Sequence, residues 1–171
     1  MGKPSAIILH HELGNQGFQG VNEYHRQLWN FKSSLGYFCG YQYYIDKTGK
    51  VWQARKDDEE GAHTIGRNND SIAICLQGNL DVERPSLVQL VALKNLILKK
   101  MTEWIIKPDQ VFSHRTYASY KSCPGKLWKE SEIKDLFNPD RNYYVKLLES
   151  LKEKLLNMKR QLGNYKHDDY V

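Results

Sequence analysis

Short apolar runs and longer amphipathic stretches alternate along the first 140 residues of the chain. Five runs rich in β-branched and aromatic residues predict strands. They cover residues 6–9, 41–45, 51–53, 71–76 and 111–113. Apolar residues at helical spacing predict helices over residues 21–34 and 85–104, the second opened by a Ser86-x-x-Gln89 capping box. This order of elements predicts an α/β fold, in which helices flank a central mixed β-sheet.

A further, C-terminal amphipathic helix is predicted after residue 140. Apolar residues recur there at spacings of 4, 3, 4, 3 and 4, at Tyr144, Leu148, Leu151, Leu155, Met158 and Leu162. We therefore expect a compact domain over residues 1–138, followed over residues 139–171 by this helix and a short acidic tail. Three interpretations of the apolar stripe stay open: it packs on the first domain, it mediates self-association, or it contacts a membrane or partner.

Positive charge is concentrated in the same segment. Residues 141–166 hold seven Lys or Arg against two Glu, a net charge of +5, whereas residues 1–140 hold 18 against 16, a net charge of +2. A basic amphipathic helix can hold a protein on the anionic cell envelope. No nucleic-acid-binding motif accompanies the basic residues, so we expect no nucleic acid as a partner.

Two histidines and one cysteine are candidate metal ligands. His10 follows the first predicted strand, His114 follows the last, and Cys123 lies nine residues further on in a polar loop. Two imidazoles and a thiolate leave a tetrahedral zinc ion one ligand short, which is typical of a catalytic site. The spacing matches no zinc-finger pattern, and each residue alone is more often structural. The nearby Lys121 makes Cys123 a better candidate ligand, because a positive charge lowers the pKa of a thiol and the thiolate is the form that binds a metal.

Several motifs, in sequence order, carry a resemblance to a known family. They are HH at 10–11, GYQYYI at 40–45, DKTGKV at 46–51, GAHT at 61–64, SIAI at 71–74 and KSCP at 121–124. Together they resemble the zinc-dependent N-acetylmuramoyl-L-alanine amidases, in the superfamily of type-2 amidases and peptidoglycan recognition proteins, and most of all the small phage endolysins. The resemblance extends from about residue 5 to about residue 130.

The resemblance implies the metal site residue by residue. The ligands of one Zn²⁺ per chain would be His10, His114 and Cys123, the three residues that their chemistry already suggests. His11 is the alternative to His10 as the first ligand. Because side chains alternate along a strand, only one of these two neighbours can face the metal.

The resemblance also implies two catalytic residues. Tyr41 matches a tyrosine that hydrogen-bonds the zinc-bound water, where it would orient this water or help to deprotonate it. Lys121 matches a lysine of the phage-type amidases and would stabilise the oxyanion that develops during amide hydrolysis. Without the resemblance, Tyr41 would be assigned to packing and Lys121 to the solvated surface.

Four residues are candidates for binding the substrate. By the resemblance, His63, Thr64 and Asn68 lie near the substrate groove, where they would contact the peptide stem or the sugar. His63 is also compatible with a loop residue that hydrogen-bonds only the backbone. Arg55 would pair with a carboxylate of the stem peptide, or alternatively with the acidic run at residues 57–60.

The implied function is zinc-dependent hydrolysis of the amide bond between N-acetylmuramic acid and L-alanine, with peptidoglycan as the partner. The alternative is a peptidoglycan-binding module of the same fold without catalysis. Cys123 discriminates between the two, since the non-catalytic members of the superfamily typically lack this cysteine. Its presence favours the enzyme.

The N-terminus and the other cysteines bear on the compartment. Met1-Gly2-Lys3-Pro4 is too short to hold the apolar region of a signal peptide, so we expect synthesis in the cytoplasm and action on peptidoglycan after release. A phage endolysin, a virion-borne lysin and a recycling amidase all fit this expectation. Cys39 and Cys75 lie in apolar surroundings, either as reduced core residues or as one disulfide.

Overall fold

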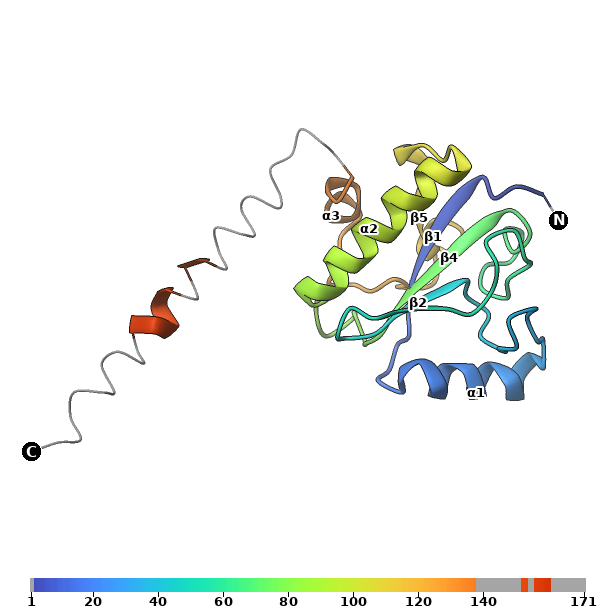
Figure 1. Ribbon diagram of the computed structural model, residues 1–171, viewed down its shortest axis with the longest axis horizontal. Coiled ribbons are helices and arrows are strands. Elements are labelled where there is room, and N and C mark those ends of the chain that lie inside the picture. Colours follow the sequence, from blue (N-terminus) through green and yellow to red (C-terminus); the bar gives the residue numbers. More distant parts are fainter. Residues whose placement is uncertain (1, 138–151, 154–155, 161–171) are drawn as a thin grey trace, which may run out of the picture. The chain divides into compact units, whose positions relative to one another are not determined.

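The computed structural model describes residues 2–137, 152–153 and 156–160. Its elements follow one another as β1 (Ala6–His11), α1 (Gly17–Trp29), β2 (Tyr43–Ile45), β3 (Val51–Gln53), β4 (Ser71–Leu76), α2 (Leu87–Trp104), η1 (Pro108–Gln110), β5 (Val111–Ser113), η2 (His114–Thr116) and α3 (Glu130–Asp135). In the described part of the chain, the strands form a mixed five-stranded sheet (Figure 1). The predicted α/β fold with a central mixed sheet is confirmed.

The order of the strands in the sheet is β3-β2-β4-β1-β5. Strand β1 runs parallel to both of its neighbours, β4 and β5, and β2 runs parallel to β4. Only β3, the second strand of the predicted hairpin, is antiparallel to its partner β2. The register pairs Leu9 of β1 with Ser113 of β5, so the residues that follow each strand emerge at the same edge of the sheet.

Helices α1 and α2 cover opposite faces of the sheet (Figure 1). Two neighbours on β2 show this, because successive side chains of a strand point to opposite faces. The ring of Tyr44 lies 5.8 Å from that of Phe18 on α1, whereas the ring of Tyr43 lies 5.2 Å from the Nζ of Lys100 on α2. With both faces covered, β1 and β4 are buried along their whole length, which explains their continuous apolar runs.

Helix α1 begins four residues and ends five residues earlier than the predicted range 21–34. Asn30 ends it by adopting a left-handed conformation with φ of 49°, and its N–H donates to the carbonyl of Arg26. At the other end, the carboxylate of Glu12 accepts the backbone N–H groups of Gln16 and Gly17, which have no partner within the helix. The prediction was wrong at both ends because neither device belongs to the apolar periodicity.

The predicted hairpin and long helix are both confirmed. In the turn between β2 and β3, Asp46 Oδ1 accepts the N–H groups of Thr48 and Lys50, at 2.9 and 3.1 Å. At the start of α2, the hydroxyl of Ser86 accepts the N–H of Gln89, whose side chain in turn accepts the N–H of Ser86. This is the predicted capping box, which satisfies two donors at the helix end.

The chain divides into two compact units, Met1–Phe137 and Asn138–Val171. In the second unit, residues 152–153 and 156–160 are helical. Of the predicted apolar stripe, only Met158 belongs to the described residues, where it is 53% exposed, and the rest lies outside them. The C-terminal amphipathic helix therefore stays a prediction. Among the described helices, none is both long enough and apolar enough to cross a membrane.

Candidate metal centre and active-site cleft

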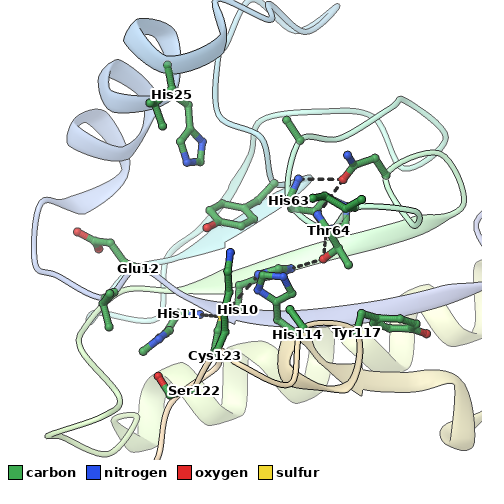
Figure 2. A pocket seen from close by; sticks show the side chains of 18 of the residues that line it. His10, His11, Glu12, His25, His63, Thr64, His114, Tyr117, Ser122 and Cys123 are labelled. Carbon is green, nitrogen blue, oxygen red and sulfur yellow. Dashed lines mark hydrogen bonds between the residues drawn. The ribbon is translucent and has the colours of Figure 1, made fainter.

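The sheet brings the three predicted metal ligands together at one edge. Strand β1 ends with His10 and His11, and β5 leads directly into η2, whose first residue is His114. Because β1 and β5 are parallel neighbours, these histidines emerge side by side. The loop after η2 returns to place Cys123 beside them, so that His10, His114 and Cys123 form one buried cluster (Figure 2).

The spacing of the ligand atoms fits a tetrahedral zinc ion. One nitrogen of each histidine and the Sγ of Cys123 all lie within 4.8 Å of one another. The distance from Cys123 Sγ to His10 Nδ1 is 3.6 Å. Zinc bonds of about 2.3 Å to sulfur and about 2.0 Å to nitrogen, at a tetrahedral angle, place such a pair about 3.5 Å apart. All three side chains also line a cleft, so these residues fit a metal that keeps one position open to it.

Burial determines the protonation of the three ligands. It lowers the pKa of His10 well below 6.5 and that of His114 to about 4, and nearby positive groups, Lys121 among them, add to both shifts. Both imidazoles are therefore neutral at pH 7, which is the form that binds a metal. Burial raises the pKa of the Cys123 thiol to about 12, outweighing the opposite effect of Lys121. A metal that binds here must displace the thiol proton.

The loop that carries Cys123 is held from two sides. Arg115 donates its backbone N–H to the carbonyl of Cys123 at 2.8 Å, and its guanidinium donates to the carbonyl of Gly125 at 3.0 Å. On the other side, the hydroxyl of Ser122 donates to the carboxylate of Asp81 at 2.7 Å. These bonds fix the backbone on both sides of the cysteine, so its Sγ has a defined position.

His11, the alternative first ligand, lies outside the cluster. Its Nδ1 accepts the backbone N–H of Leu80 at 3.0 Å, so its side chain is engaged away from the other two ligands. Its backbone N–H instead points at the Sγ of Cys123, 3.4 Å away. His10 is thus the histidine of this pair that the structure brings to the cluster, and His11 contributes a hydrogen-bond donor to the sulfur.

Tyr41 and Lys121 both line the cleft. The ring of Tyr41 packs 5.0 Å from that of His10. Burial, together with nearby thiols, raises the pKa of Tyr41 well above 10, so its hydroxyl stays protonated. Of the two roles expected for Tyr41, orienting a water molecule fits this state, whereas deprotonating one does not. Lys121 is exposed on the loop before Cys123 and adds positive charge at the mouth of the site.

The cleft has a volume of about 1020 Å³ and an apolar rim on α1. Val21 is buried, but Tyr24 and Leu28, which follow it at helical spacing, are about half exposed and line the cleft. Trp29 joins them from the end of the helix. Helical periodicity finds such residues, but it does not distinguish a side chain in the core from one at a groove.

His25 is a further cleft residue that sequence reasoning missed. It lies on the inner side of α1, where its Nδ1 accepts the backbone N–H of Gly40 at 2.9 Å (Figure 2). Burial lowers the pKa of His25 to about 4, so the ring is neutral and its proton is on Nε2. Its ring also packs 5.3 Å from that of Tyr41. The available signal was its helical spacing from Val21, which places both residues on the inner face of α1.

The predicted substrate-binding residues His63, Thr64 and Asn68 share one turn at the cleft. The Oδ1 of Asn68 accepts the backbone N–H groups of His63 and Thr64, at 2.9 and 2.8 Å. Burial lowers the pKa of His63 to about 3, so this imidazole is neutral. The Oγ1 of Thr64 lies 3.4 Å from the Nε2 of His10, so this turn contacts one of the candidate ligands directly.

Arg55 does not reach the cleft, contrary to the expectation that it contacts the peptide stem. Its side chain is fully buried and donates to the carbonyls of Phe31, Cys39 and Glu60. The Oε1 of Glu59 lies 3.9 Å from its guanidinium. The alternative, in which Arg55 is engaged by the 57–60 segment, describes its position better. With its donors directed at backbone carbonyls, Arg55 acts as a structural clamp.

The cysteines of the described domain are all free thiols. Cys39 and Cys75 are completely buried, and burial raises the pKa of Cys39 to about 12. Of the two alternatives for this pair, the structure agrees with reduced cysteines in the core and not with a disulfide. Cys123 is the cysteine that lines the cleft.

Comparison with known proteins gives this fold and site a family. The chain belongs to the N-acetylmuramoyl-L-alanine amidase family, whose model matches residues 1–126. It is 28% identical over 138 residues to peptidoglycan-recognition protein SC2 of Drosophila melanogaster, covering 74% of this chain and 71% of that protein. It is 27% identical over 103 residues to the endolysin of Klebsiella phage KP32, covering 55% of this chain and 66% of that protein.

A solved structure shows the same fold. The N-acetylmuramoyl-L-alanine amidase LysC from Clostridium intestinale URNW superposes with a TM-score of 0.68 at 27% sequence identity, covering 77% of this chain and 83% of that chain. The predicted resemblance is thus confirmed, and it includes both endolysins and peptidoglycan-recognition proteins. At the level of the family, the chain is a peptidoglycan amidase or a peptidoglycan-binding protein.

Proposed function

We propose that this protein is a zinc-dependent amidase that hydrolyses the bond between N-acetylmuramic acid and L-alanine of peptidoglycan. The observation that carries the proposal is the buried cluster of His10, His114 and Cys123, whose ligand atoms lie within 4.8 Å of one another beside the cleft. When bound there, zinc supplies the Lewis acid that activates water and polarises the amide carbonyl. A purely binding module has no use for a thiolate that is costly to ionise in a buried site.

The surroundings of the three proposed ligands set their protonation states and their positions. His10 and His114 are already neutral, so they need lose no proton. Cys123 must lose one, and the backbone N–H of His11, 3.4 Å from Sγ, stabilises the resulting thiolate. The hydrogen bonds of Arg115 and Asp81 to the surrounding loop keep the sulfur in place when the proton leaves.

The remaining cleft residues act on the substrate. The hydroxyl of Tyr41, protonated at every physiological pH, donates a hydrogen bond that orients the attacking water. Lys121 places a positive charge near the carbonyl oxygen, where negative charge develops as the amide is attacked. Removing one such stabilising group typically lowers the rate by about 100- to 1,000-fold. The apolar rim formed by Tyr24, Leu28 and Trp29 suits the less polar face of a glycan or a peptide stem.

Metal content and activity test the proposal together. Wild-type protein is expected to bind one zinc ion per chain and to release soluble stem peptides from purified peptidoglycan sacculi. Cys123→Ala is expected to lose both properties, because two ligands hold zinc poorly. Cys39→Ala, the same change at a buried cysteine away from the cleft, is the matched control and is expected to keep both.

A different outcome would favour the binding module. Peptidoglycan-recognition proteins are among the relatives of this chain. Protein without zinc that sediments with sacculi and releases no peptide would therefore overturn the enzyme and support that second function. We also propose synthesis in the cytoplasm and action on the cell wall after release, in the manner of a phage endolysin. Expressing the protein inside a bacterial cell, with the membrane either intact or permeabilised, tests whether the protein acts on the cell wall only after release.

A further inference from the structure

The side chain of Thr64 lies between two imidazoles beside the ligand cluster. Its Oγ1 is 3.4 Å from the Nε2 of His10 and 3.0 Å from the Nδ1 of His63 (Figure 2). Thr64 is only 3% exposed and His10 only 1%. A hydroxyl so deeply buried has little access to a substrate, although the resemblance made Thr64 a candidate for substrate binding. Its contacts point instead to the histidine ligand.

The contacts of this group are compatible with a metal held by the Nδ1 of His10. His10 directs its Nδ1 toward Cys123 Sγ, and a metal held there requires this nitrogen to be unprotonated. The ring is neutral, so its proton is then on Nε2, facing Thr64. In this state the Oγ1 of Thr64 accepts a hydrogen bond from the Nε2–H of His10, and it also lies 3.0 Å from the Nδ1 of His63. The Nε2 of His63 has no hydrogen-bond partner among the described residues.

The backbone holds the hydroxyl of Thr64 in place. Asn68 Oδ1 accepts the N–H groups of both His63 and Thr64, and the Thr64 carbonyl accepts the N–H of Arg67 at 3.0 Å. The N–H of Gly61 in turn donates to the carbonyl of Asn68 at 2.9 Å. These hydrogen bonds hold the backbone of the turn, and the backbone in turn fixes where the Thr64 side chain lies relative to β1.

We propose that Thr64 is a positioning residue, whose hydroxyl holds His10 in the tautomer and ring orientation that present Nδ1 to the metal. The inference rests on the proposed zinc site and assigns to it a supporting residue. Hydrogen bonds from the second nitrogen of a ligand histidine orient the ring and strengthen its binding. Their loss typically weakens metal affinity by about 10- to 100-fold.

The test is zinc affinity, measured by competition with a chelator on the full-length protein. Thr64→Val replaces the hydroxyl by a methyl group of similar size, and we expect it to weaken zinc binding by about 10- to 100-fold. Thr64→Ser keeps the hydroxyl and is expected to stay within about threefold of wild type. The matched control is Thr102→Val, the same change on the exposed side of α2, where the hydroxyl only donates to the Leu98 carbonyl. It is expected to leave affinity unchanged.

Further readouts separate positioning from mere stability. The absorption spectrum of the Co²⁺-loaded protein reports ligand geometry, and we expect Thr64→Val to change it while Thr64→Ser does not. If Thr64→Val unfolds, Thr64→Ala removes the hydroxyl without adding volume and takes its place. Wild-type zinc affinity and Co²⁺ spectrum in the valine or alanine variant would overturn the role of Thr64. Failure of the wild type itself to bind zinc would instead overturn the proposed function.

Discussion

Zinc binding to the metal-free protein is expected to release one proton near pH 6. Burial lowers the pKa of His114 to about 4, so only about 1% of this imidazole is protonated at pH 6, whereas about three quarters would be at the ordinary pKa of 6.5. The pKa of His10 is also well below 6.5. The Cys123 thiol, with a pKa raised to about 12, is fully protonated. Binding thus displaces the thiol proton alone.

This proton count determines how zinc affinity depends on pH. One released proton makes the affinity rise about tenfold per pH unit between pH 5.5 and 6.5. If both histidines had their ordinary pKa, about 2.5 protons would be released at pH 6, and the affinity would rise about 300-fold per unit. The two cases differ by far more than the error of a titration.

The assay is chelator competition at several pH values, with proton release followed by an indicator dye in weak buffer. Cys39→Ala, which lacks a thiol that the site does not use, is the control and is expected to give the same slope as wild type. A slope above two protons near pH 6 would refute the assignment of neutral histidines. A slope near zero would refute the protonated thiol.

Three further predictions follow from other parts of the structure. Lys121→Ala is expected to lower the rate of peptide release about 100-fold or more without changing zinc affinity, as measured by kinetics and chelator competition. Arg55→Met leaves the buried carbonyl of Cys39 and the partly buried carbonyls of Phe31 and Glu60 without this donor, so urea unfolding is expected to show a loss of about 3 kcal/mol or more. The metal-free protein is expected to lose stability as the pH falls from about 6.5 toward 4, because the unfolded chain then binds protons that buried His25, His63 and His114 do not. Between pH 7 and 5 each histidine is expected to contribute about 1–2 kcal/mol of this loss, and urea unfolding at the two pH values measures it.

Each of these three predictions has a control or an outcome that would contradict it. Lys126→Ala, on the same loop but outside the cleft lining, is expected to keep the rate. Stability of the Arg55→Met protein equal to wild type would contradict the clamp. Stability that stays constant or rises on acidification from pH 7 to 5 would contradict the low pKa values of the buried histidines.

Local sequence patterns predicted the strands of the sheet and the three candidate ligands that the fold brings together. Strand β4 was predicted with its observed bounds, since a buried parallel strand is a continuous apolar run. The capping box at Ser86 marked the start of α2, because both partners lie within three residues. His10 and His114 were grouped by their metal-binding chemistry and by the resemblance, and the structure brings them to one edge because β1 and β5 are parallel neighbours.

Some helix ends and side-chain contacts could not be read from the apolar pattern of the sequence. The end of α1 depends on the left-handed Asn30, and its start on the carboxylate of Glu12. The resemblance made Arg55 and Thr64 candidates for substrate binding, with engagement by residues 57–60 as the alternative for Arg55. Each side chain contacts partners within the protein, and no local pattern predicts this direction. The direction of the pKa shift of Cys123 was misjudged as well, because the burial that outweighs the nearby lysine is known only from the fold.

The most direct test of the proposed function is the identity of the bond that is cut. Sacculi would be digested with the zinc-loaded protein, and newly formed amino groups and reducing sugars would be labelled and identified by mass spectrometry. We predict a new amino terminus on L-alanine and no new reducing sugar, and we predict that Cys123→Ala forms no new amino terminus. New reducing sugar, a new amino terminus on another residue, or no cleavage by protein that holds its zinc would contradict the account.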